Sequence, residues 1–292
     1  MQRTRRNRFI GLAYVAPALA FVLAFTVYPL GRMIWMSLHN WSLITEPSFI
    51  GLDNYRQAFG DRQFWVSFLF TLKYTVLITP VLIVGGYLLA LLTAPASRMR
   101  AFTRTVIFVP VVISLGVSSL LWYWLFSPDA GLVNKALADL GVIDEPVLWL
   151  GVSAQQSNLA ITASVVWKVI GFGMILFVGA IQAIPSEVTE ASLVDGASYR
   201  QRVTNVILPL TLRTVLLVTL VSVIGSLLAF DQFYIMTAGQ PQNETATSVF
   251  FVYLNSFPYL KLGYGAALSM VLALTILAFT VVQLILTRRS HA

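Results

Sequence analysis

Residues 262–287 read LGYGAALSMVLALTILAFTVVQLILT and contain no charged side chain. The hydrocarbon core of a bilayer is about 30 Å thick, so a helix needs roughly 20 apolar residues to cross it. The stretches 9–31, 74–97 and 105–128 are also free of charge and long enough to span. The pattern predicts helices that cross a membrane.

The overall composition points the same way. Of the 292 residues, 58% are hydrophobic and 11% are charged, and the mean hydropathy is +0.79. Soluble domains carry roughly a quarter charged residues. Because so apolar a chain cannot cover itself with polar surface, an ordinary soluble domain is excluded.

Two further spans contain charges. The stretch 146–186 is broken only by Lys168, and 211–235 contains Arg213 near its start and Asp231 near its end. We therefore expect an all-α integral membrane protein with about six transmembrane helices in a single domain, residues 1–292. The expected spans are approximately 9–36, 68–94, 104–126, 159–184, 211–235 and 263–287. The first is too long for a cleaved signal peptide, whose apolar region is about 7–15 residues.

The basic residues gather on one side of these spans. With the N-terminus in the cytoplasm, the cytoplasmic side receives Arg3, Arg5, Arg6, Arg8, Arg98, Arg100, Arg104, Arg200, Arg202, Arg288 and Arg289. The opposite side receives fewer basic residues and most of the acids. This bias predicts that both termini are cytoplasmic. It also explains the net charge of +7 without nucleic-acid binding.

The cytoplasmic loop at about 185–210 is too polar to span and too patterned to be disordered. Pro185 suits a helix start, with Ser186 as a candidate N-cap. Gly196 allows a sharp exit, and a second helix near Ser198 would merge into the fifth span, with Pro209 at the junction. We expect a helix–turn–helix at the membrane face. An ordinary amphipathic loop is the alternative.

Catalytic signatures are missing from the sequence. There is no cysteine, no GxxxxGK[ST] phosphate loop, and there are only two histidines, His39 and His291. A metal site, a Ser-His-Asp set and ATP hydrolysis by a phosphate loop are therefore not expected. The chain is predicted to be a non-catalytic transport protein that takes its energy from elsewhere.

Four residues are candidates for a substrate pathway. Lys168 lies near the middle of the fourth span and Asp231 toward the outer end of the fifth, and charges in a membrane usually face a cavity or the interior of a bundle. Trp167 and Tyr234 belong to a set of aromatic side chains on which a sugar would stack. The alternatives are structural: Lys168 would pair with a carbonyl or an acid, Asp231 would simply sit at the interface, and aromatic residues favour membrane interfaces.

The loop contains Glu190, Ala191, Ser192, Asp195, Gly196 and Ala197, and it ends in Ile207-Leu208-Pro209. This segment resembles the loop that marks the permeases of binding-protein-dependent ABC importers, which reads Glu-Ala-Ala, three residues, Gly, nine residues, Ile, one residue, Leu-Pro. Two positions depart from that pattern: Ser192 replaces an alanine and Val206 an isoleucine.

Other segments resemble the sugar and glycerol-phosphate permeases of that family. They are FIGLDNY at 49–55, Trp167-Lys168 with Gly171, MTAGQP at 236–241 with Thr245 beyond, and GYGAA at 263–267. Gln240 departs from the glycine often found there.

The resemblance implies the rest of the assembly. Such a chain pairs with a second, homologous permease subunit, and two ATPase subunits bind ATP and Mg on the cytoplasmic side. A solute-binding protein delivers the cargo from outside. The loop would form the coupling helix that docks on an ATPase, through Glu190, Ala191, Asp195, Gly196, Ala197 and Pro209. The setting would be a bacterial cytoplasmic (inner) membrane, and this chain would bind no cofactor.

The resemblance favours a disaccharide or oligosaccharide as cargo. A glycerol-phosphate-type anion or another polar organic solute is the runner-up, because Lys168 would suit a phosphate. A stand-alone secondary transporter or channel is the alternative of another class, and a membrane enzyme or assembly factor lacks a catalytic constellation.

Overall fold

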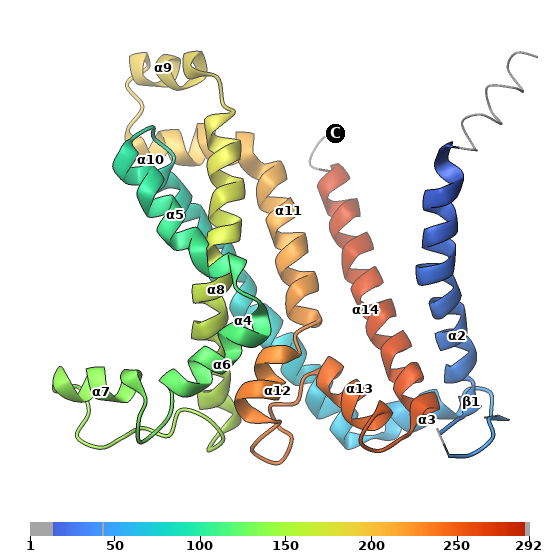
Figure 1. Ribbon diagram of the computed structural model, residues 1–292. Helices are drawn as coiled ribbons and strands as arrows, with labels where there is room; N and C mark the ends of the chain where they lie inside the picture. Colours follow the sequence, from blue (N-terminus) through green and yellow to red (C-terminus); the bar gives the residue numbers. More distant parts are fainter. Residues whose placement is uncertain (1–13, 43, 290–292) are drawn as a thin grey trace, which may run out of the picture. The chain divides into compact units, whose positions relative to one another are not determined.

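The computed structural model describes residues 14–42 and 44–289, and the chain divides into two compact units. One unit contains the described residues up to Arg62 together with Val252–Thr275, and the other contains Gln63–Phe251 and the described residues from Ile276 onward. The elements drawn in Figure 1 are η1 (Leu23–Val27), α2 (Tyr28–Ser37), β1 (His39–Asn40), β2 (Ser48–Phe49), α3 (Asp53–Gly60), α4 (Arg62–Thr93), α5 (Arg98–Val112), α6 (Leu115–Leu125), α7 (Leu132–Asp139), α8 (Ala154–Gln182), α9 (Ser186–Val194), α10 (Tyr199–Arg202), η2 (Val203–Ile207), α11 (Leu208–Leu227), α12 (Asp231–Thr237), α13 (Ser248–Ser256) and α14 (Leu262–Arg289).

Among the described residues, five helical stretches are long and apolar enough to cross a membrane, and a bent pair of helices makes a sixth if the pair is counted as one span. They are Tyr14–Ser37, Arg62–Thr93, Ala154–Gln182, Tyr199–Leu227, Leu262–Ile285 and the pair Arg98–Val112 with Leu115–Leu125. The protein is an all-α, multi-pass membrane protein, as its charge-free stretches indicated.

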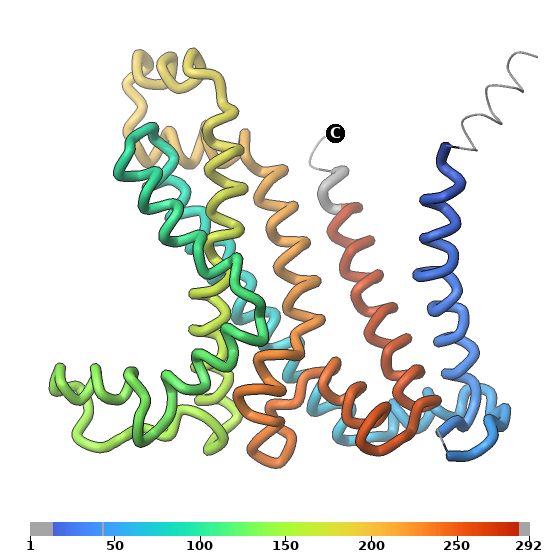
Figure 2. Tube along the Cα trace, viewed as in Figure 1, coloured from blue at the N-terminus to red at the C-terminus, as the bar shows by residue number. Residues whose placement is uncertain are grey.

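The third expected span, 104–126, falls on two helices that meet at 98°. Pro110 lies in the last turn of α5 and supplies no N–H, and Ile113 and Ser114 adopt extended backbone conformations. The Ser114 hydroxyl then accepts a hydrogen bond from the Val117 N–H at 3.3 Å, which starts α6 as a new helix. The Cα trace follows the chain through this bend (Figure 2).

The fifth expected span, 211–235, begins earlier and ends sooner than its apolar residues indicated. The helix runs without a break from Tyr199 to Leu227, and α12 starts again at Asp231. The break leaves the carbonyl of the buried Ala229 without a helical donor. This carbonyl accepts a hydrogen bond of 2.6 Å from the buried hydroxyl of Thr247. A side chain from the following loop therefore supplies the donor that the interrupted helix lacks.

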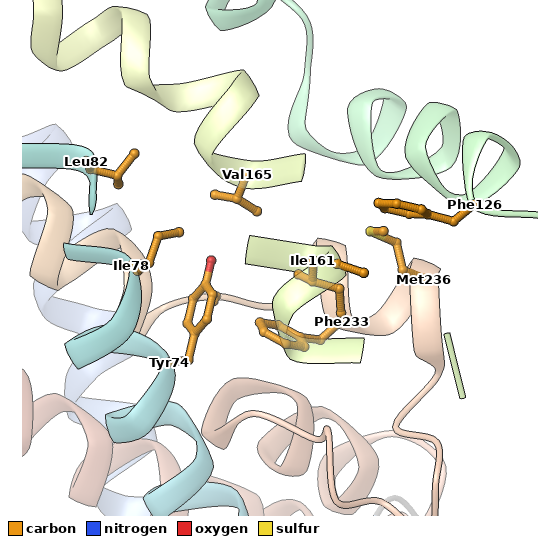
Figure 3. Packing of buried hydrophobic residues seen from close by; sticks show 10 residues of the cluster. Tyr74, Ile78, Leu82, Phe126, Ile161, Val165, Phe233 and Met236 are labelled. Carbon is orange, nitrogen blue, oxygen red and sulfur yellow. The ribbon is translucent and has the colours of Figure 1, made fainter. Parts of the chain in front are cut away.

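Two buried clusters hold the second unit together. Figure 3 shows the first, where Tyr74, Ile78 and Leu82 of α4 face side chains from three other segments. Those partners are Phe126 after α6, Ile161 and Val165 of α8, and Phe233 and Met236 of α12. The second cluster includes Tyr87 and Phe177, and the Tyr87 hydroxyl pairs with Thr211 Oγ1 at 2.8 Å.

The α5 and α8 helices touch backbone to backbone at Gly171. A Cβ placed on Gly171 would lie 2.5 Å from the Ile107 carbonyl oxygen and 3.0 Å from the Phe108 Cα. Both neighbouring atoms belong to the main chain, so they cannot move aside as a flexible side chain would. Small residues at such contacts let membrane helices approach closely.

In the first unit, the segment 49–55 closes the end of α2. The amide of Asn54 is buried and donates to the carbonyls of Ser37 and His39 at 2.9 and 3.0 Å. The Tyr55 hydroxyl donates to Ser37 Oγ at 2.7 Å. Helices end with unpaired carbonyls, and this motif supplies the missing donors.

We expect Gly171→Ala to lower the thermal unfolding temperature of the purified protein, because the added methyl group overpacks a backbone contact at a typical cost of about 1–3 kcal/mol. Gly179→Ala is the matched control on the same helix, since no atom lies within 4 Å of its Cβ position. An equal effect of the two substitutions would contradict the close contact.

We expect Asn54→Ala to lower the unfolding temperature as well, because two carbonyls lose their donor at about 1–3 kcal/mol for an unsatisfied buried group. Asp53→Asn is the control, because it removes only an exposed ion pair with Arg56 (2.9 Å), worth about 0–1 kcal/mol. Differential scanning fluorimetry in detergent measures both. A larger decrease of the unfolding temperature in Asp53→Asn than in Asn54→Ala would refute the role of Asn54 in capping α2.

Candidate functional site

The α9 helix forms the part of the loop that was expected to dock on a partner. Pro185 precedes the helix as its N-cap and Glu187 lies in the first turn. Ser186, expected as the N-cap, is already helical, and its carbonyl accepts a hydrogen bond from the Thr189 hydroxyl at 2.8 Å. Figure 1 shows α9 as the outermost element at its end of the second unit.

The helix ends in a turn that only Gly196 makes easily. Gly196 has a φ of +74°, and nothing lies within 4 Å of its Cβ position, so backbone conformation and not space requires the glycine. The Ala197 N–H closes the turn on the Ser192 carbonyl at 3.0 Å. The expected helix–turn–helix is therefore confirmed.

Ser192, one of the two departures from the family pattern, is accommodated locally. Its hydroxyl donates to the Thr189 carbonyl at 2.6 Å, and the residue is 9% exposed. A serine thus takes the place of a small apolar residue without leaving an unpaired polar group.

The second arm of the loop is rigidly joined to the following span. Ser198 and Gln201 form a capping box at the start of α10. A π turn, Val203–Ile207, follows, and the Leu208 N–H bonds to the Val203 carbonyl. Because a wider turn relieves the clash of a proline ring with the preceding turn, Pro209 enters the helix without breaking it.

The surface of the loop combines acidic and apolar groups. Glu190, Ala191, Asp195 and Gly196 are exposed, Ala197 is half-buried and Pro209 is exposed. Val194 is 88% exposed, which is unusual for a large apolar side chain beside an ordered turn. Such a surface suits a protein partner that brings basic groups and an apolar patch.

Lys168 is held by the backbone of a neighbouring helix. Its side chain is buried, and Nζ donates to the Val111 carbonyl at 3.3 Å, next to the break between α5 and α6. In the part of the chain that the structure describes, no carboxylate forms an ion pair with Lys168. A positive charge at the C-terminal end of a helix is favourable, and here it also satisfies a carbonyl that the break leaves unpaired.

The other three pathway candidates lie on the elements around Lys168. Asp231 is half-buried and opens α12, where a negative charge is favoured by the helix dipole. Tyr234 is 42% exposed and its ring stacks on Phe230 at 5.3 Å. Trp167 is 38% exposed. These residues belong to packed helices, but no ion pair between described residues joins Lys168 to Asp231.

A row of aromatic rings runs from the loop before α8 toward Trp167. Successive ring centroids are 5.8 Å apart from Trp149 to Phe126, 5.2 Å from Phe126 to Trp122, and 5.7 Å from Trp122 to Trp167. A cavity of about 150 Å³ lies beside the first two rings. Phe126 is buried in the core, whereas Trp122, Trp149 and Trp167 keep part of their surface accessible and would suit the C–H faces of sugars.

Gln232 is a polar residue that charge-based reasoning missed. It is 3% exposed, its amide nitrogen lies 3.5 Å from the Tyr74 hydroxyl, and its side-chain oxygen has no hydrogen-bond partner among the described residues. An uncharged polar side chain within an apolar stretch was the available signal. Among the described residues, no group of three or more His, Cys, Asp and Glu side chains is placed to hold a metal ion.

The sequence matches known transport proteins over most of its length. The trehalose/maltose transport system permease protein MalF of Thermococcus litoralis is 33% identical, with 96% of this chain and 94% of that protein covered. The sn-glycerol-3-phosphate transport system permease protein UgpA of Yersinia pestis is 31% identical, with 92% of this chain and 90% of that protein covered. The lactose transport system permease protein LacF of Rhizobium radiobacter is 31% identical, with 94% of this chain and 92% of that protein covered.

The fold also matches a solved transporter. A crystal structure of a bacterial alginate ABC transporter in complex with an alginate pentasaccharide-bound periplasmic protein aligns with a TM-score of 0.87 at 22% identity, covering 99% of this chain and 97% of that one. Residues 67–291 match the family model described as the binding-protein-dependent transport system inner membrane component. The chain therefore belongs to the family of inner membrane permeases of binding-protein-dependent transport systems.

Proposed function

We propose that the chain is a transmembrane subunit of a bacterial ABC importer and that it moves a disaccharide or oligosaccharide across the inner membrane. The observation that carries this proposal is the exposed α9 helix, joined through α10 and the π turn to one continuous span, Tyr199–Leu227. A short rigid helix tied to a span transmits a displacement, whereas a loose loop absorbs it. The energy would come from two separate ATPase subunits that bind ATP and Mg.

The remaining partners follow from the same proposal. A second, homologous permease completes the pore and a solute-binding protein delivers the cargo. The structure of the alginate transporter in complex with a pentasaccharide-bound periplasmic protein supports the second partner. The two chain termini, which lie outside the described residues, would both be cytoplasmic, because the arginines at 98, 100, 200 and 202 are expected on that side. The chain itself is non-catalytic.

A neutral sugar is favoured over an anion because of the contact made by Lys168. The residue is only 8% exposed and its Nζ donates to the Val111 carbonyl, so the ammonium is placed as a structural group and is little exposed to a phosphate. Relatives named for trehalose/maltose and lactose transport support a sugar, while relatives named for sn-glycerol-3-phosphate keep the anion as the alternative. Binding assays with the cognate solute-binding protein distinguish the two cargoes.

A stand-alone secondary transporter would need paired ionisable groups near the middle of the membrane. The lack of an acid paired with Lys168 among the described residues argues against that alternative. Co-purification with an ATPase tests it directly.

We expect Glu190→Lys to leave membrane insertion intact and to lower transport-coupled ATP hydrolysis, because the substitution reverses an exposed charge on α9. Asp144→Lys, an equally exposed acid in the loop before α8, is the matched control. Hydrolysis is measured in the reconstituted complex with and without loaded binding protein. Equal coupling in both variants would remove the docking role of α9.

Gly196 provides a second test of the same helix. Gly196→Val should lower coupling strongly, because a β-branched residue does not tolerate a φ of +74°. Gly196→Asn should retain most of the coupling, because asparagine adopts this conformation more readily. Similar losses in both variants would indicate that the conformation of the turn is not what matters.

We expect Lys168→Met to lower the maximal transport rate and the unfolding temperature while leaving the apparent KM for the sugar unchanged. Methionine keeps the length of the side chain but cannot donate to Val111, so the break after α5 loses its tether. Transport into proteoliposomes measures both kinetic constants. A raised KM with unchanged stability would instead make Lys168 a cargo contact.

A further inference from the structure

An open groove runs between α5 and α8 in the second unit. Ala101, Arg104, Thr105 and Phe108 line it from α5, and Ile175, Val178, Gly179 and Gln182 line it from α8. Each set repeats at i, i+3, i+4 and i+7, so each helix presents one continuous face to the groove. The enclosed volume is about 460 Å³.

The groove is polar at one end and apolar along the rest. Arg104 lies about 9 Å along α5 from Arg98, at 1.5 Å per residue, and Phe108 lies about 6 Å deeper. On the opposite wall, Gln182 ends α8, and Ile175 lies two turns before it. A guanidinium near the surface and hydrocarbon walls further in match the two parts of an amphiphile.

Arg104 is the one charged residue among those that line the groove. The Thr105 hydroxyl donates to the Ala101 carbonyl at 3.1 Å, and the Gln182 amide donates to the Ala94 carbonyl at 2.8 Å. Within the described residues, the Arg104 side chain makes neither a hydrogen bond nor an ion pair. A ligand with several polar groups, such as a peptide, would leave most of them unpaired here.

The charge of this end is uncompensated by its own helices. Arg104 lies in the groove lining, and neither α5 nor α8 contains an acidic residue that would neutralise it. The groove therefore suits a ligand with one anionic group and a long apolar tail.

We propose that the α5–α8 groove binds an anionic phospholipid, with the phosphate at Arg104 and an acyl chain along Phe108, Ile175 and Val178. Basic pockets between membrane helices suit such headgroups. The arginine reaches the headgroup region while its stem packs on the groove wall. The proposal depends on the chain lying in a bilayer and not on its cargo.

The test measures lipid binding by the purified, assembled transporter in detergent, without sugar or ATP. Phosphatidylglycerol and phosphatidylcholine with identical acyl chains are titrated separately, and bound lipid is counted by native mass spectrometry. We expect a preference for phosphatidylglycerol. Arg104→Gln should reduce this preference about fivefold, since one basic residue contributes roughly 1 kcal/mol to anionic lipid binding.

Two variants distinguish lipid binding in the groove from a general effect of positive charge on lipid binding. Arg100→Gln removes the same charge from the same helix outside the groove lining, and it should retain the preference. Gly179→Leu keeps Arg104 but projects a side chain into open space, since no atom lies within 4 Å of its Cβ position, so it should displace both lipids.

The proposal is overturned if the wild-type complex binds both lipids equally. It is also overturned if Arg100→Gln and Arg104→Gln reduce the preference for phosphatidylglycerol by the same factor. A photo-reactive benzoylphenylalanine in place of Phe108 gives an independent outcome. Cross-linking to phospholipid supports the assignment, whereas cross-linking to a partner polypeptide would show that a subunit covers the groove. Because these experiments measure no transport, their results would stay the same if the proposed cargo were wrong.

Discussion

Backbone groups that lie in hydrocarbon must find their partners inside the chain, and the irregular points of this fold are built around that requirement. The Val111 carbonyl at the break after α5 receives Lys168, and the Ala229 carbonyl after α11 receives Thr247. At the end of α2, Asn54 serves two carbonyls at once. At each of these three places a polar side chain from elsewhere in the same unit supplies the donor, which keeps interrupted helices compatible with a membrane.

Much of this architecture was predictable because it follows from local rules. Charge-free stretches located the membrane helices, and the spacing of Pro185, Gly196 and Pro209 gave the helix–turn–helix. The residues of that loop could be assigned because the conformations of glycine and proline are set by their own covalent structure. Whether Glu190 and Asp195 contact an ATPase stays a prediction, since that contact depends on another chain.

Other features depend on contacts between distant segments and were hidden from a reading of spans alone. The 98° bend within the third span needs Pro110, Ser114 and a donor from α8 together. Lys168 carried two interpretations in the sequence, and its position beside Val111 favours the structural one. The groove at Arg104 arises from two helix faces that are 74 residues apart in the sequence, so from the sequence alone this arginine counted only toward the charge bias.

The π turn at Val203–Ile207 also sets an angle. A helix advances by about 100° per residue, and this turn holds one more residue than an α-helical turn would. Rewinding the same residues as a regular α-helix would push the extra residue into the next turn and swing the α9 hairpin around the axis of α11 by about 100°, whereas deleting one residue would leave the hairpin nearly in place. The azimuth of α9 therefore depends on the π turn, and if two such chains pair around a common pore as proposed, both would need to keep this phase to present their α9 helices alike.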